Sequence, residues 1–230
     1  MKKKILITGS TGFIGKNLLK MLPNDHEIYC LSRKNFKNKK INFIKANIFN
    51  LKKINILIKK IKPDYLIHLA WEAEPQKYLH KKINIKWAQA STNLFYNFCK
   101  NNGKKAVLIG SILENNLSDN YFYEREINLK KKLDQNLYNI SKIKFYNNAK
   151  KIKKKFRSNF VWVRIPWLYG PFEKKQRLIP KLIYCLKNNR KIMIQNPNNS
   201  INILHVEDIV NVIYLLLFSK INGVFNLVNS

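Results

Sequence analysis

A turn with three glycines follows the first apolar segment of the chain. The residues ITGSTGFIG place Gly9, Gly12 and Gly15 between a predicted strand over residues 4–8 and a helical pattern behind it. The whole sequence has only seven glycines, so three of them in one turn are a strong constraint. Such glycines let a backbone approach a pyrophosphate, and the helix that follows offers free N–H groups. The turn therefore predicts a dinucleotide site, although three glycines could also serve only a sharp bend.

Short apolar runs alternate with helical patterns along the rest of the chain. The runs predict strands at 26–32, 41–48, 64–70, 105–111, 160–165 and 223–228, with helices at 14–22, 54–61, 83–98, 138–152, 178–186 and 208–218. Fully apolar strands that alternate with helices are typical of an α/β protein with a parallel sheet covered on both faces. We therefore expect a Rossmann-type, doubly wound sheet, with ligands at the carboxyl ends of its strands. The irregular residues 115–136 suggest a loop over the site.

Composition narrows the class of partner. The formal net charge is +31, which suggests a nucleic acid, but the lysines lie along the whole chain and accompany abundant Asn and Ile. We expect no specific nucleic-acid partner and keep a basic binding protein as a weaker alternative. The three cysteines form no metal or disulfide pattern, and His205 and Asp208 are expected to order a helix start rather than bind a metal. No run is long enough for a membrane span or a signal peptide, so we expect a cytoplasmic protein with no membrane partner.

The end of the second predicted strand indicates the cofactor. Sites that prefer NAD place an acid about 20 residues beyond the glycines, where it holds the ribose 2′-OH. Here Ser32 lies at that distance and Arg33 follows it, and no Asp or Glu occurs between Ile28 and Pro63. A 2′-phosphate suits these residues better than a bare diol, which favours NADP(H) over NAD(H). The alternative is that Arg33 is one more solvated cation.

Six segments, in this order, carry a resemblance to a known family: TGSTGFIG at 8–15, HLAW at 68–71, GSILE at 110–114, YNISK at 138–142, RIPWLYGP at 164–171 and HVEDIV at 205–210. Together they resemble the extended short-chain dehydrogenase/reductase family, in its branch of NAD-dependent epimerases, dehydratases and reductases acting on nucleotide sugars. The resemblance implies one domain over 1–230, with a dinucleotide-binding core over about 1–168. Residues 169–230 would form a small, incomplete substrate lobe with return elements, because relatives continue further.

The same resemblance assigns roles to residues. Ser111 would polarise the substrate oxygen, Tyr138 would donate or accept a proton, and Lys142 would hold the nicotinamide ribose. Besides Tyr138 and Lys142, the cofactor would be bound by Gly9, Thr11, Gly12, Phe13, Ile14, Gly15, Ser32, Arg33, Asn47, Ile48, Leu69, Ala70, Trp71, Ile165 and Pro166. A homodimer through the helices 83–98 and 138–152 is also implied.

The pair Tyr138 and Lys142 is not unique in this lysine-rich chain. The same spacing occurs at Tyr78, Tyr96 and Tyr146. Position separates them, because Tyr138 starts the helix that follows the Ser111 strand and so lies at the ligand edge. Tyr146 is two turns further along that helix, about 12 Å away. A lysine ammonium beside the tyrosine would favour the phenolate, which lets it pass a proton at neutral pH.

Three departures from the family pattern concern the substrate. Dehydratases of the family carry an Asp-Glu pair directly after the catalytic Ser or Thr, where this chain has Ile112 and Leu113, with Glu114 one residue later. Dehydration is therefore less expected than reduction or epimerisation. Trp167 stands where many members have Asn, and Ile201 stands where many have an arginine that clamps the diphosphate, which Arg177 or Arg190 could replace. We assign Glu114, Trp167 and Arg177 to the substrate site. The sequence thus predicts an NAD(P)-dependent enzyme acting on a nucleotide sugar, with a non-catalytic dinucleotide-binding protein as the alternative.

Overall fold

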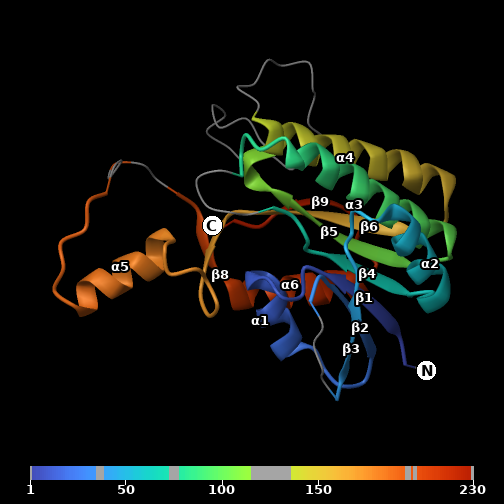
Figure 1. The fold of residues 1–230 in the computed structure, drawn as a ribbon, viewed down its shortest axis with the longest axis horizontal. Helices are drawn as coiled ribbons and strands as arrows, with labels where there is room; N and C mark the ends of the chain where they lie inside the picture. The colour runs from blue at the N-terminus through green and yellow to red at the C-terminus, as the bar shows by residue number, and fades with distance from the viewer. Residues whose placement is uncertain are drawn as a thin grey trace.

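The computed structural model describes residues 2–34, 39–72, 78–114, 136–194, 198 and 201–228. The loop expected over 115–136 lies outside these residues except for its last position. The described part is built around a parallel sheet of seven strands, which Figure 1 shows nearly edge-on. Its strands are β1 Lys4–Thr8, β2 Glu27–Ser32, β3 Ile41–Lys45, β4 Tyr65–His68, β5 Lys105–Ser111, β6 Asn159–Ile165 and β9 Gly223–Asn226.

The strand order shows where ligands should bind. The order is β3-β2-β1-β4-β5-β6-β9 and every pair is parallel, so the chain winds one way from β1 and then the other way from β4. This is the doubly wound Rossmann-type sheet that the sequence predicted. The order reverses between β1 and β4, and in such sheets the ligand crevice opens at the carboxyl ends beside that reversal.

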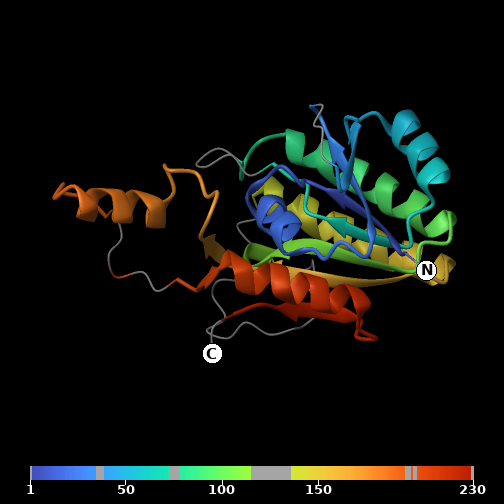
Figure 2. The ribbon, with the colours of Figure 1, turned by 90° about the horizontal axis from the view of Figure 1, so that it is seen from below.

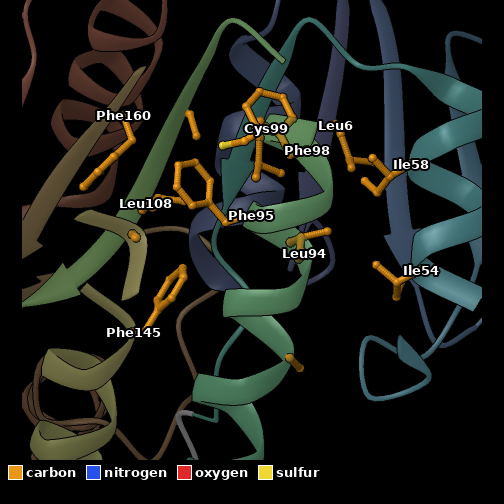
Figure 3. Close-up of a cluster of buried hydrophobic side chains, with 14 of the residues drawn as sticks. Leu6, Ile54, Ile58, Leu94, Phe95, Phe98, Cys99, Leu108, Phe145 and Phe160 are labelled. Atoms are coloured by element: carbon orange, nitrogen blue, oxygen red, sulfur yellow. The ribbon is translucent and has the colours of Figure 1, made fainter. Parts of the chain in front are cut away.

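Helices cover both faces of the sheet (Figure 1). Helices α1 Phe13–Met21 and α6 Val206–Phe218 cover one face, and α2 Leu51–Ile61, α3 Ile83–Lys100 and α4 Leu137–Lys155 cover the other. Alternate residues of each strand serve the two cores. Ile5 and Ile7 face α1 and α6, whereas Leu6 faces α2 and α3, as the close-up of the second core in Figure 3 shows. Strands buried on both faces explain the nearly continuous apolar runs in the sequence.

The C-terminal part divides between the core and a protruding arm. Helix α6 packs beside α1, and β9 extends the main sheet next to β6, so both belong to the core. The short strands β7 Trp167–Tyr169 and β8 Ile203–His205 pair with each other, which the sequence patterns did not predict. Helix α5 Leu178–Lys187 stands away from the body in Figures 1 and 2. Within the expected lobe, only the part that precedes α6 therefore lies outside the Rossmann core.

None of the described helices is long and apolar enough to cross a bilayer.

Candidate active site

The glycine turn is packed directly against the loop that follows β4. Gly9 has φ of +75°, and a Cβ at this position would lie 2.7 Å from the backbone nitrogen of Ala70. The N–H of Gly12 donates to the carbonyl of Gly9 at 3.0 Å and closes the turn. A Cβ at Gly15 would lie 2.5 Å from the Cα of Ser10, so α1 rests on the turn itself. Glycine is therefore required at Gly9 and Gly15 by close backbone approach.

The start of α1 is open to an anion. Gly12 is the N-cap and has no side chain to accept a hydrogen bond from the first turn, and that turn contains no acidic residue. Thr11 is exposed, and Phe13 and Ile14 are half-buried. Free N–H groups and the positive end of the helix dipole are the features that bind phosphate. These residues fit a dinucleotide, since the first turn of α1 has neither a side-chain cap nor an acidic residue that would compete with a phosphate.

The residues expected around the adenosine lie at the ends of β2 and β3, beside β1. Ser32 is buried and its Oγ accepts the N–H of Lys34 at 3.2 Å, whereas Arg33 is exposed. Asn47 is exposed with its Oδ1 accepting the N–H of Phe49 at 3.1 Å, and Ile48 is buried. These positions share the carboxyl edge of the sheet with the glycine turn.

Ser111 and Tyr138 meet at the same edge. Ser111 ends β5 and Tyr138 lies in the first turn of α4, close enough for the Ser111 hydroxyl to lower the pKa of the Tyr138 phenol. Asn136 caps the helix by accepting the N–H of Asn139 at 3.0 Å, so α4 begins at the ligand edge of the sheet. Tyr146 is buried in the core, away from this edge. Position along the helix therefore separates the two tyrosines, as the sequence predicted.

Desolvation is the main influence on the pKa of the Tyr138 phenol. Desolvation, together with Tyr78 and Glu114, raises its pKa above the usual range, while the Ser111 hydrogen bond and Arg177 lower it. The sequence argument expected the neighbouring lysine to lower this pKa. It does not, because the Lys142 ammonium is 5.7 Å from the Tyr138 ring centre and is held elsewhere. In this structure Tyr138 is a neutral phenol, the form that can donate a proton.

Lys142 is one helical turn beyond Tyr138 and is 4% exposed. Its Nζ donates to the carbonyl of Ile109 at 2.7 Å and lies 4.0 Å from the ring centre of Trp71. Burial lowers the pKa of Lys142 to about 7, against the opposing effect of Glu114. Lys142 therefore gains and loses its proton near neutral pH, next to the loop that the sequence assigned to the cofactor.

Comparison with models of protein families identifies the family of this chain. Residues 5–227 match the family model described as the NAD dependent epimerase/dehydratase family. The chain belongs to this family.

Individual relatives lie within the family's nucleotide-sugar members. The chain is 29% identical to the dTDP-D-glucose 4,6-dehydratase of Dictyostelium discoideum, over 98% of this chain and 58% of that protein, so it spans less than two thirds of that relative. It is 24% identical to the CDP-abequose synthase of Salmonella typhimurium, over 96% of this chain and 72% of that protein.

Solved structures share the fold. One is the UDP-N-acetylglucosamine 4-epimerase from Methanobrevibacter ruminantium, in complex with UDP-N-acetylmuramic acid. Its TM-score is 0.77 at 23% sequence identity, and the matched region spans 99% of this chain and 77% of that one. Another is the enzyme WbmH of Bordetella bronchiseptica, in complex with NAD+. Its TM-score is 0.77 at 16% sequence identity, and the matched region spans 100% of this chain and 76% of that one.

Within this epimerase/dehydratase fold, Glu114 does not lie where a substrate residue should. Its side chain is 1% exposed. One carboxylate oxygen accepts the N–H of Ser111 at 2.7 Å, and the other accepts Nε1 of Trp162 at 2.8 Å and Nε of Arg164 at 3.1 Å. Three protein donors therefore engage the carboxylate behind the serine. The assignment to substrate is corrected to a role in holding the Ser111 turn.

The other two substrate candidates lie on the C-terminal arm. Trp167 is 39% exposed on β7, directly after Pro166, which is buried, and Ile165, which pairs with Ser111 in register. Arg177 caps the start of α5 and is close enough to Tyr138 to lower the pKa of its phenol. The structure thus brings Arg177 toward the site across a long stretch of sequence.

Sequence reasoning missed Tyr78. Its ring packs edge-on against Tyr138 at 4.9 Å between centres, and Leu79 accepts the Tyr138 backbone N–H at 2.9 Å. Tyr78 precedes the Ser111 strand in the sequence, and its Tyr-x-x-x-Lys spacing is the one local signal that singles it out.

His68 and His205 have structural roles, and for His205 this is the helix start that the sequence predicted. His68 is buried between the hydroxyls of Thr8 and Ser91, at 2.6 and 2.7 Å, and burial lowers its pKa to about 3. His205 caps α6 by accepting the N–H of Glu207 at 3.4 Å.

Proposed function

We propose that this protein is an NAD(P)-dependent oxidoreductase or epimerase that acts on a nucleotide-activated sugar. The observation that carries the proposal is the assembly of Ser111, Tyr138 and Lys142 at the carboxyl edge, beside the glycine turn that fits a dinucleotide. The relatives support the substrate class, since their names or bound ligands are dTDP-, CDP- and UDP-linked sugars.

Each residue of the site has a chemical task. Gly9, Gly12 and Gly15 would hold the cofactor's phosphates, and a bound nicotinamide dinucleotide supplies a hydride acceptor or donor. Tyr138 transfers a proton to or from the substrate oxygen at its phenolic Oη. Ser111 donates a hydrogen bond to the same oxygen, where negative charge develops. The Lys142 ammonium lies one helical turn away and would hold the ribose of a bound nicotinamide dinucleotide.

Reduction or epimerisation is favoured over dehydration. Ile112 and Leu113 occupy the positions that the family resemblance gives to the acid pair of dehydratases, and Ile112 is buried. Glu114 is engaged by three protein donors. Removal of water from the sugar needs a positioned acid and base, which these residues do not supply. Incubation with dTDP-, UDP- and CDP-glucose, followed by NMR and mass analysis, tests this assignment. A product one water lighter would contradict it.

The preference for NADP(H) rests on Ser32 and Arg33 at the end of β2. NAD is the cofactor in the WbmH structure, so the comparison supports a nicotinamide dinucleotide without the preference. Titration with NADPH and NADH, followed by nicotinamide fluorescence, measures both affinities. We expect Arg33→Ala to weaken NADPH about tenfold or more and NADH little, since one charge-assisted phosphate contact is lost. The matched control is Lys154→Ala, which removes one exposed charge at the far end of α4. An equal loss of NADPH affinity in both variants would mean that the removal of any positive charge weakens binding, and that Arg33 makes no specific contact.

Tyr138→Phe separates catalysis from binding. The variant keeps the ring and loses the proton-transfer group, so turnover should fall by about 10²–10⁴ while the cofactor Kd changes little. A protein that binds cofactor but has no activity to lose would instead be the non-catalytic dinucleotide-binding protein. Steep salt-dependent binding to DNA with no cofactor binding would favour the basic binding protein.

A homodimer through α3 and α4 completes the proposal. The two helices lie side by side on one face of the sheet (Figure 1), and a groove between them is lined by Thr92, Tyr96, Asn148 and Ile152 among others. Light scattering after gel filtration measures the mass directly, and a monomer at all concentrations would reject the dimer.

A further inference from the structure

The environment of Lys142 contains a residue that the reaction chemistry above does not use. The ammonium has the Ile109 carbonyl at 2.7 Å and the face of the Trp71 indole at 4.0 Å from the ring centre. A cation over the face of an indole is attracted by the ring's quadrupole, and the attraction grows when water is excluded. Trp71 follows β4, and Lys142 lies on α4, which comes after β5 in the chain. The contact therefore joins two segments that are far apart in the sequence.

The indole is itself fixed from several sides. Its Nε1 donates to Oδ1 of Asn84 at 2.9 Å, and Asn84 is fully buried with Nδ2 donating to the Tyr78 and Lys81 carbonyls. The ring stacks on Trp87 at 6.1 Å and on Phe145 at 6.3 Å between centres. A hydrogen bond at the edge and rings on its faces leave the indole one orientation.

We propose that Trp71 is a positioning residue of this site, whose indole face holds the Lys142 ammonium in place beside the Ile109 carbonyl. The inference rests on the proposed function for its catalytic meaning, but the contact itself does not. A lysine side chain has much rotamer freedom to lose, and a second contact fixes it before any ligand arrives. Without the ring, the Ile109 carbonyl is the one acceptor in the described part of the chain that would restrain the ammonium.

Among the residues that the structure describes, few other charged or titratable groups surround Lys142, which makes the contribution of the ring measurable. Glu114 of the turn after β5 raises the pKa of Lys142. His68 of β4 is neutral because burial and Lys142 together lower its pKa to about 3. Tyr138 on the same helix is a neutral phenol. Replacing Trp71 leaves all three in place.

The test measures the titration of Lys142 in the intact protein. Competitive acetylation over a range of pH, read by mass spectrometry, gives the pKa of this lysine, with exposed Lys154 as the reference for reagent reactivity. We compare Trp71→Leu, which keeps an apolar cover but no π face, with Trp71→Phe, which keeps a π face. We expect Trp71→Leu to lower the pKa of Lys142 by about one unit, the tenfold change typical of a desolvated cation–π contact. Trp71→Phe should shift it by less than about half as much.

Trp87→Leu is the matched control, since it removes an indole that stacks on Trp71, whereas the rings that face the Lys142 ammonium are those of Trp71 and Tyr138. It should leave the Lys142 pKa unchanged. A pKa that stays or rises in Trp71→Leu, or an equal shift in Trp87→Leu, would overturn the proposal. Thermal melts confirm that each variant folds, and Trp71→Met replaces Trp71→Leu if the latter does not. Because lysine titration needs neither cofactor nor turnover, failure of the proposed function and failure of this inference are separate results.

Discussion

Replacement of Gly15 by alanine sets two principles against each other. Gly15 lies inside α1, where a glycine-to-alanine change ordinarily stabilises a helix by about 1 kcal/mol. In this fold, however, the new Cβ would lie 2.5 Å from the Cα of Ser10. Backbone atoms cannot rotate away as a side chain does, so α1 or the glycine turn must move.

We expect the cost of the steric clash to exceed the gain in helix propensity. Overpacking in a tight site costs about 1–3 kcal/mol, and a backbone neighbour puts this position at the upper end. After the propensity gain, we expect a net loss of about 2 kcal/mol in the free energy of unfolding. For a domain of this size that is a fall of about 4–8 °C in Tm. Displacement of the turn should also weaken NADPH binding.

Urea unfolding and a thermal melt measure the change, with Gly12→Ala as the control. A Cβ at Gly12 meets the Gly9 carbonyl oxygen at 3.2 Å, which a small shift relieves, so this variant should lose about 1 kcal/mol or less. If Gly15→Ala were as stable as the parent protein, α1 would not rest on the turn as described, and the argument from close approach would be refuted.

Three further predictions concern buried polar groups. Lys105→Met should lower the free energy of unfolding by about 2 kcal/mol in urea, because the ammonium donates at 2.6 Å to the carbonyl of Ser219 at the end of α6; an unchanged midpoint would argue against this contact. Glu114→Gln should cost about 3–5 kcal/mol, since it leaves the fully buried Arg164 without its carboxylate, and a chemical melt checks it. His68 has a folded pKa of about 3, below its ordinary 6.5, so the unfolded state takes up the proton first and stability falls as pH drops below about 6.5. Its contribution to the slope is at most about 1.4 kcal/mol per pH unit, which His68→Gln should abolish; parallel pH profiles would reject it.

Local patterns in the sequence determined the order of strands and helices. Apolar periodicity follows from which face of each element is buried, so it is written in neighbouring residues. The glycines at 9, 12 and 15 and the position of Tyr138 at a helix start placed the candidate site at the carboxyl edge for the same reason. The family resemblance added the role of Ser111.

Contacts between distant residues decided the rest. Glu114 looks like a substrate ligand in sequence because it closely follows Ser111, yet Trp162 and Arg164 engage its carboxylate from another strand. The low Lys142 pKa depends on burial, and the raised Tyr138 pKa depends on desolvation and on Tyr78. Local spacing fixes which elements form and where their ends lie. Only packing determines how much water a charged group loses and which partner replaces it, and that loss governs the protonation states of the site.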